Sequence, residues 1–429
     1  MTYLPIAAGK VVMKFRWLLK SRATLILATG IASVLAFKAL KLIIRSKVHL
    51  HACFGGPKWF LPGLGFLPKS LDHMHRALEI FADTYGSIYC VKVTGMDVVV
   101  LSDPNLIRQV LKERPNNFTR FGNEDKILPF SGMFTAEGEE WKRNRRLGAP
   151  AFNEKNSTAM ITDMSRVALK LVRQLSSLTR ERRIVWSPTE WIPLCTLDVL
   201  CITSLGNDYN FLNPDGLSLG HRSRVVQQAI NDTMAGSGYA VTLGYFPWMT
   251  RDRFPWNLNP MIHKLHAGLK RLRGNCDEII RERLEERRAG ERDKRRDLLD
   301  KLLDLDREDL LGNLITFFIA GSDTSAMTVA WCLYYLCLNP CIQSEARAEV
   351  DALGHDPETM EDLNLVPYIE CCVLEALRLQ PPSAFLLHEC IADTSLNGKT
   401  VPSGTVVITL IRKAMVTTSQ GGTIFKYAD

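Results

Sequence analysis

The sequence predicts a mainly α-helical protein with small β-sheets and an N-terminal membrane-anchor helix. Three observations predict this fold class. Helical patterns dominate from about residue 104 to residue 380, short strand patterns flank them, and a basic leader with an apolar run precedes them. The 429 residues are 46% hydrophobic and 23% charged, so the chain can build a sizeable core.

The leader differs in charge from the rest of the chain. The first 71 residues carry eleven Lys and Arg and no acid, whereas the remainder carries 42 basic and 46 acidic residues. A body that is not basic argues against nucleic-acid binding, and a basic leader argues for membrane association or targeting. Ala23–Phe37 is free of charge, and Lys38 and Lys41 can snorkel to the interface, so we expect an uncleaved anchor within residues 1–50. An organellar transit peptide is the alternative.

Four further segments have clear local signals. Residues 51–70 are rich in Gly and Pro and predict a hinge between the anchor and the body. Ser87–Leu101 predicts a β-hairpin. Apolar residues recur at steps of three and four from Ile262 to Ile279 and predict one amphipathic helix. Near the end, Asn397-Gly398 signals a tight turn, and residues 405–411 are β-rich.

The segment Leu310–Ser344 is 35 residues long and carries one charged side chain, Asp323. An isolated carboxylate in an apolar segment is costly to bury unless something pairs with it or uses it. Ala320 and Gly321 precede it and would let a flat ligand approach the backbone. Thr324 follows, and an acid beside an alcohol suits proton relay. The run is long enough to span a membrane, but the polar residues along it favour a buried central helix.

Two shorter motifs also lie on predicted helices. Trp141 and Arg145 are spaced i, i+4 and share a helix face. Glu375 and Arg378 are spaced i, i+3 as an ion pair, just before Gln380-Pro381-Pro382 stops the helix. Taken alone, the first motif is typical of a solvated basic helix and the second occurs by chance in most large proteins.

Taken in order, these motifs resemble the cytochrome P450 monooxygenases. The order is Trp-x-x-x-Arg, then Ala-Gly-x-Asp-Thr in a long apolar helix, then Glu-x-x-Arg before Pro-Pro. The likeness covers the chain from Pro57 to about Lys413. It implies the cytochrome P450 fold, haem as cofactor, a lipophilic substrate, and electrons from NADPH through a reductase or another donor.

The resemblance also implies how haem is held. Trp141 and Arg145 would hydrogen-bond a haem propionate, and His388 would be a further propionate contact. Ala320 and Gly321 would line the distal face of the haem.

Two more pairs receive roles from the same resemblance. Asp323 and Thr324 would deliver protons to iron-bound dioxygen. Glu375 and Arg378 would brace the haem-binding core and take no part in the chemistry.

One feature of the family is missing from the sequence. The haem-ligand cysteine of the family lies in a Phe-x-x-Gly-x-x-x-Cys-x-Gly loop, and none of the eleven cysteines here does; the last, Cys390, precedes Ile391. Only 54 residues follow Glu375. We therefore expect residues 71–429 to be an incomplete domain, a fragment or a truncated chain, that should not catalyse the family's reaction without its thiolate. Cysteine and histidine spacings predict no other metal site.

The favoured interpretation is a haem-thiolate monooxygenase that hydroxylates a fatty acid or another lipophilic compound with O2 and electrons from a reductase. It would be anchored in the endoplasmic reticulum with its body in the cytosol, or lie in a mitochondrion or plastid. The alternatives are a haem-free, membrane-anchored binding or regulatory protein, and an unrelated multi-span membrane protein.

Overall fold

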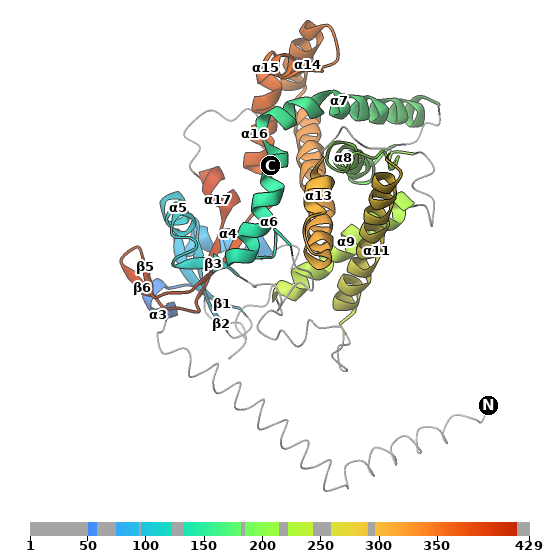
Figure 1. Cartoon of the computed structure of the whole chain (residues 1–429). Helices are drawn as coiled ribbons and strands as arrows, with labels where there is room; N and C mark the ends of the chain where they lie inside the picture. The colour runs from blue at the N-terminus through green and yellow to red at the C-terminus, as the bar shows by residue number, and fades with distance from the viewer. Residues whose placement is uncertain are drawn as a thin grey trace, which may run out of the picture.

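A computed structural model shows a helical body with small sheets, as predicted (Figure 1). The predicted anchor lies outside the described residues, apart from the last residue of its range. The structure describes residues 50–57, 74–93, 96–121, 132–181, 185–213, 222–242, 259–290 and 297–417.

Helices make up most of the described chain. Those before the long central helix are α3 (Leu50–Phe54), α4 (Met74–Tyr85), α5 (Pro104–Lys112), α6 (Gly138–Gly148), η3 (Ala149–Phe152), α7 (Glu154–Ser176), η4 (Ser177–Glu181), α8 (Pro188–Leu205), α9 (Arg222–Thr242), α11 (Pro260–Arg288) and α12 (Leu298–Leu302). The central helix and those after it are α13 (Arg307–Leu338), α14 (Pro340–Leu353), α15 (Met360–Asn364), α16 (Pro367–Leu379) and α17 (Ile411–Thr417).

The main sheet joins strands from both ends of the chain in the order β1-β2-β7-β4-β3. Its strands are β1 (Ile88–Val93), β2 (Met96–Leu101), β3 (Phe118–Arg120), β4 (Leu386–Cys390) and β7 (Val406–Thr409). The antiparallel pair β1 and β2 is the predicted hairpin, and β7 adds to β2 in parallel. Residues of α3, α5 and α17 are buried against one face, and residues of α4 against the other.

The smaller sheet confirms the predicted tight turn. It pairs β5 (Thr394–Leu396) with β6 (Lys399–Val401). Asn397 and Gly398 join the strands with φ angles of 52° and 73°, the left-handed pair that a two-residue hairpin turn requires. The β-rich segment 405–411 forms a strand only as far as Thr409, because α17 begins at Ile411.

The start of the predicted hinge packs on the main sheet. Leu50 and Phe54 of α3 are buried in the core of the sheet. The Cys90 backbone N–H donates to the Gly55 carbonyl at 2.8 Å. Gly56 has a φ of 144°, and a Cβ there would overlap the Cys90 carbonyl oxygen, so glycine lets the chain lie against the strand. The predicted hinge from residue 58 onwards lies outside the described residues.

The largest core lies between α8, α9, α11 and α13. The predicted amphipathic helix is α11, which buries its apolar residues from Ile262 to Ile279. Two glycines bring α11 and α9 close together. A Cβ on Gly268 would lie 2.6 Å from Thr233 Oγ1, and a Cβ on Gly236 would lie 2.8 Å from Leu265 Cα.

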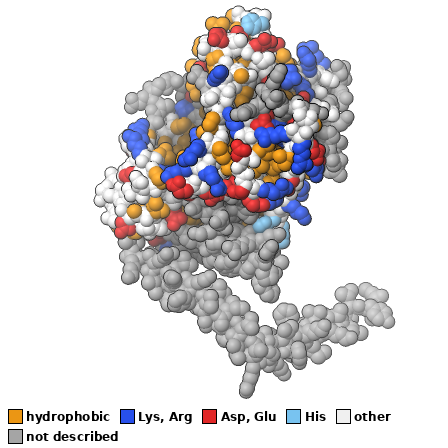
Figure 2. Space-filling model, in the orientation of Figure 1, with side chains coloured by type: hydrophobic (Ala, Val, Ile, Leu, Met, Phe, Trp, Pro, Cys, Tyr) orange, Lys and Arg blue, Asp and Glu red, His pale blue; other side chains and the backbone are white. Residues whose placement is uncertain are grey.

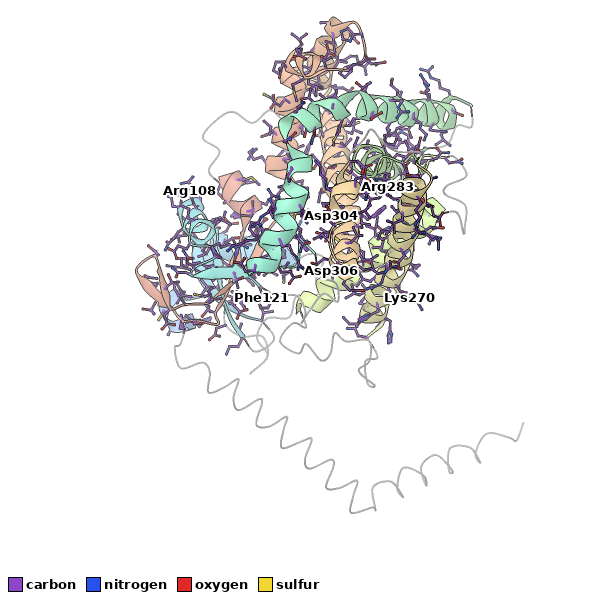
Figure 3. The ribbon with its side chains drawn as sticks, in the orientation of Figure 1. Arg108, Phe121, Lys270, Arg283, Asp304 and Asp306 are labelled. Atoms are coloured by element: carbon purple, nitrogen blue, oxygen red, sulfur yellow. The ribbon has the colours of Figure 1, made fainter. Side chains whose placement is uncertain are left out.

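Charged side chains are intermixed on the face seen in Figure 2, where Lys and Arg alternate with Asp and Glu. Arg307 at the start of α13, for example, pairs with Asp277 of α11 at 2.5 Å. One basic residue of α11 is instead buried. Arg283, labelled in Figure 3, has a fully buried side chain and pairs with Asp297 at 2.8 Å and Asp300 at 3.0 Å, which ties α11 to α12.

The long apolar segment forms α13, which runs through the middle of the helices (Figure 1). Its residues from Leu310 to Thr316 are buried, so this half is the predicted core helix. The helix ends at Leu338, and α14 begins at Pro340. Among the described helices, none alone has the length and hydropathy to cross a membrane, although α13 and α14 together meet the test across a 115° bend.

Candidate functional site

The position of α6 against α13 is set by one fully buried amide. Asn313 of α13 accepts a hydrogen bond from the Met133 backbone N–H at 2.8 Å. It donates to Asn144 Oδ1 of α6 and to the Asp309 carbonyl, the latter at 2.8 Å. A Cβ on Gly132 would lie 2.7 Å from the α13 backbone, so the turn before α6 packs directly on that helix. Sequence reasoning had counted Asn313 only as scattered polarity.

A charged contact adds to this link. Arg143 of α6 pairs with Asp309 and, at 3.5 Å, with Asp306. Asp306, labelled at the foot of α13 in Figure 3, caps that helix by accepting the Asp309 backbone N–H at 3.0 Å. That hydrogen bond, with a smaller contribution from Arg143, lowers the pKa of Asp306. The helix with Trp141 and Arg145 is therefore held firmly beside the helix with Asp323 and Thr324.

The middle of α13 presents small and hydroxyl side chains to the surface. Ala320 and Thr324 are exposed one turn apart, although the first half of the helix is buried. The Thr324 hydroxyl donates to the Ala320 carbonyl at 2.8 Å, and the Thr328 hydroxyl donates to the Thr324 carbonyl at 2.9 Å. Gly321 lies on a different side, where a Cβ would be 3.1 Å from Leu200 Cδ1 of α8. The structure therefore places Ala320 and Thr324 together and sets Gly321 against α8.

Asp323 is half-buried, and burial raises the pKa of its carboxyl. Within the described residues it makes no hydrogen bond or ion pair. Successive helical residues point about 100° apart, and no hydrogen bond joins Asp323 to Thr324 in this part of the chain. The next carbonyl back, that of Ser322, accepts from the Thr196 hydroxyl of α8 at 2.8 Å. Asp323 thus has a carboxyl that is easier to protonate than an ordinary one and is free to exchange its proton.

A cluster of basic side chains lies on one face of the main sheet. His388 of β4 stands directly opposite Arg120 of β3, which precedes Phe121, labelled in Figure 3. Only 1% of His388 is exposed; burial, and then the charge of Arg114, lower its pKa to about 4. His388 Nε2 lies 3.4 Å from Thr409 Oγ1, whereas His388 Nδ1 and Arg114 Nε are buried and have no hydrogen-bond partner among the described residues.

Glu137 provides a carboxylate for this cluster. Its Oε1 lies 3.3 Å from Arg114 Nη2 and 3.6 Å from Arg120 Nε. The sequence analysis did not identify Arg114, Arg120 and Glu137, because only the tertiary structure brings them together. The pairing of β3 with β4 places Arg120 opposite His388, and Arg114 lies a few residues before β3. Within the described residues, the side chains of Trp141 and Arg145 make no hydrogen bond or ion pair. The structure therefore gathers two arginines around His388 but joins neither residue of the Trp-x-x-x-Arg motif to it.

The other predicted pair forms a bidentate ion pair on α16. Arg378 Nε lies 2.7 Å from Glu375 Oε2, and Arg378 Nη2 lies 2.9 Å from Glu375 Oε1. The side chains are only 17% and 10% exposed, for Arg378 and Glu375 respectively. Such two-point geometry holds a guanidinium in a fixed orientation.

The described cysteines are mainly structural. Cys390 is fully buried beneath the sheet, where its thiol donates to the Ala392 carbonyl at 2.9 Å. Burial raises the pKa of this thiol to about 11, which disfavours the thiolate that a metal would need. In the described part of the chain, no group of three or more His, Cys, Asp or Glu side chains comes together to hold a metal ion.

Comparison with known proteins decides the family. A sequence model of the family described as Cytochrome P450 matches residues 55–415. The chain belongs to this family. Flavonoid 3'-monooxygenase of Arabidopsis thaliana is 27% identical over 417 residues, covering 91% of this chain and 77% of the relative. Cyclooctat-9-en-7-ol 5-monooxygenase of Streptomyces melanosporofaciens is 30% identical over 352 residues, covering 78% and 70%. A bifunctional cytochrome P450/NADPH–P450 reductase of Aspergillus oryzae is 28% identical over 331 residues, covering 71% and 27%.

Membership of the cytochrome P450 family implies haem, and the described residues fit part of it. The unpaired buried nitrogens of His388 and Arg114, beside the Arg120 guanidinium, suit the carboxylates of haem propionates. The exposed stretch at Ala320 and Thr324 suits a flat ring. The described residues offer no counterpart of the family's thiolate ligand to the haem iron, because no cysteine of the sequence lies in the family's ligand loop.

Proposed function

We propose that the protein, once its haem carries the thiolate ligand of the family, inserts one oxygen atom of O2 into a lipophilic substrate, with a fatty acid or another lipid as the favoured class. Electrons would come from NADPH through a reductase, as the name of the bifunctional Aspergillus relative suggests for that protein. The observation that carries the proposal is the buried, unpaired Nδ1 of His388 beside Arg114 and Arg120. The carboxylates of a propionate-bearing cofactor would satisfy the unpaired Arg114 Nε and the buried His388 ring.

Haem held by this protein would supply the redox chemistry that sends one oxygen atom of O2 to the substrate and the other to water. Forming water consumes two protons, and Asp323 and Thr324 are the groups that would hold and pass them. The Asp323 carboxyl is easier to protonate because burial raises its pKa. The Thr324 hydroxyl commits its hydrogen to the Ala320 carbonyl, so its oxygen lone pairs are free to accept a hydrogen bond.

The remaining predicted residues position the cofactor. The side-chain donors of Trp141 and Arg145 are unpaired within the described residues, and they would bind a propionate together with His388. Glu375 and Arg378 would brace the core through their bidentate ion pair. Ala320 leaves room for the ring, and we assign Gly321 chiefly to packing against α8.

We also propose that residues 1–50 anchor the protein in the endoplasmic reticulum with the body in the cytosol; import into a mitochondrion or plastid is the alternative. Alkaline carbonate extraction of the expressed protein tests the anchor. Retention in the pellet supports it, whereas quantitative release, or processing near residue 50 inside an organelle, contradicts it.

A second candidate function is lipophile binding without turnover. The burial of Cys390, Cys372 and Cys332 favours it, because the pKa of each thiol is raised by desolvation. Haemin titration of a version of the chain extended through the family's cysteine loop, followed by reduction and addition of CO, separates the two candidates; the 429-residue chain itself is expected to show no thiolate-type band. Saturable uptake with a thiolate-type ferrous–CO band supports monooxygenation. The absence of that band, with a lipophile still bound, supports the second candidate.

The proton-transfer roles are tested by Thr324→Ala in the haem-loaded protein extended through the family's cysteine loop. We expect substrate binding to persist while reducing equivalents are diverted to hydrogen peroxide, because water would protonate the wrong oxygen. General acid–base groups typically contribute about 10²–10⁴-fold in rate. Thr328→Ala is the matched control, since it removes an equivalent hydroxyl one turn further along α13. Equal coupling of NADPH use to product in both variants would remove Thr324 from the relay.

A further inference from the structure

The arginines of the basic cluster share a single carboxylate oxygen. Both Arg114 and Arg120 approach Glu137 Oε1, at 3.3 and 3.6 Å. Charge-assisted hydrogen bonds are usually about 2.7–2.9 Å, so neither contact is tight. Within the described residues, two further buried nitrogens are unpaired: Arg114 Nε, which is a donor, and His388 Nδ1, which donates in one of the two tautomers of the neutral ring. Glu137 is therefore the carboxylate that the two arginines share, although Arg120 also donates to the Phe134 carbonyl.

The Glu137 side chain does not help to cap the adjoining helix α6. The residue occupies the N-cap of α6, but its side chain makes no capping hydrogen bond. Gly138 follows with a φ of 60°, and a Cβ there would meet nothing within 4 Å. Glycine moves easily between such conformations. The Glu137 side chain can therefore swing away from the arginines while Asn313 and Arg143 keep α6 in place.

We propose that Glu137 is a built-in substitute for a haem propionate, which holds Arg114 and Arg120 in the haem-free protein and must leave when the cofactor is loaded. This inference rests on the proposed haem site. A propionate that enters with Glu137 in place adds a second negative charge to the same guanidiniums, and like charges at such distances repel. Glu137 thus stabilises the empty cluster and slows or weakens loading of the cofactor.

The two effects of removing this charge have opposite signs. Glu137→Gln should lower the melting temperature of the haem-free protein, because Arg114 and Arg120 each lose an ion pair. The same variant should raise haemin affinity about three- to tenfold, since two partly exposed ion pairs no longer compete with the propionate. A residue with a purely structural role would lower both quantities together.

The experiment measures haemin binding by Soret absorbance and haem-free stability by thermal melting. Haemin dimethyl ester, which lacks free propionates, is the second ligand. Glu139→Gln is the matched control, because Glu139 is an exposed glutamate of the same helix that pairs with Lys142. We expect tighter haemin binding only in Glu137→Gln, no gain with the dimethyl ester, and wild-type behaviour in Glu139→Gln.

Several results would overturn the proposal. These are an unchanged or weaker haemin affinity in Glu137→Gln, an equal gain with the dimethyl ester, or an equal gain in Glu139→Gln. If Glu137→Gln does not fold, Glu137→Asp keeps the charge on a shorter side chain, and we expect a smaller gain of the same sign; no gain overturns the proposal. If the wild-type chain takes up no haemin, the haem site and this inference both fail. If it takes up haemin and Glu137→Gln matches it, only this inference fails.

Discussion

Asn313 is the residue whose loss should most disturb the junction between α6 and α13. Asn313→Ala removes the acceptor of the part-buried Met133 N–H and the donor to the buried Asn144 Oδ1. Each buried polar group left unpaired costs about 1–3 kcal/mol. We therefore expect the free energy of unfolding to fall by about 2–5 kcal/mol. Haemin binding should weaken as well, because α6 carries Trp141.

Urea unfolding followed by circular dichroism measures this loss. Asn339→Ala is the control, since its amide donates to the Tyr335 carbonyl within its own helix end and links no other element. A double-mutant cycle with Asn144→Ala isolates the contact between the two amides, and residues in one network show coupling of about 0.5–3 kcal/mol. The reasoning would be refuted if Asn313→Ala lowered the free energy of unfolding by less than about 1 kcal/mol, or if the effects of Asn313→Ala and Asn144→Ala were strictly additive.

Three other predictions concern stability and follow from separate contacts. The pKa of His388 is about 4 in the folded protein and lies higher in the unfolded chain, so the unfolded chain takes up the proton first as the pH falls. The free energy of unfolding should therefore fall by about 3 kcal/mol between pH 6.5 and 4 because of His388. Urea unfolding of His388→Asn should show a smaller fall over this pH range than the wild type, and an equal fall in both proteins would contradict the prediction. Gly268→Ala should lower the melting temperature, because the new Cβ would clash with α9. Gly274→Ala on the same helix should raise it, because a Cβ there meets no atom within 4 Å. A change of melting temperature in the same direction in both variants would contradict this prediction. Glu375→Gln should cost about 2–4 kcal/mol in urea unfolding by leaving the Arg378 guanidinium without its carboxylate, and a loss below about 1 kcal/mol would show that the pair is dispensable.

The local elements of this protein could be predicted from its sequence. The hairpin at Ser87–Leu101, the turn at Asn397-Gly398 and the helix stop at Gln380 depend on side-chain periodicity and on turn residues a few positions apart. Asp323 could also be identified from the sequence, because burying one carboxylate in a long apolar segment is costly unless it has a partner or a function. The family order of motifs came from the same local signals.

The strand order and the basic cluster were decided only by the tertiary structure. Arg120 meets His388 because β3 pairs with β4, and Glu137 reaches Arg114 because Asn313 holds α6 against α13. The pairing register of distant strands depends on how the whole core packs, and no local pattern specifies it. For the same reason the resemblance could suggest His388 as a propionate contact, but no local pattern could show that Arg120 lies opposite it and shares Glu137 with Arg114.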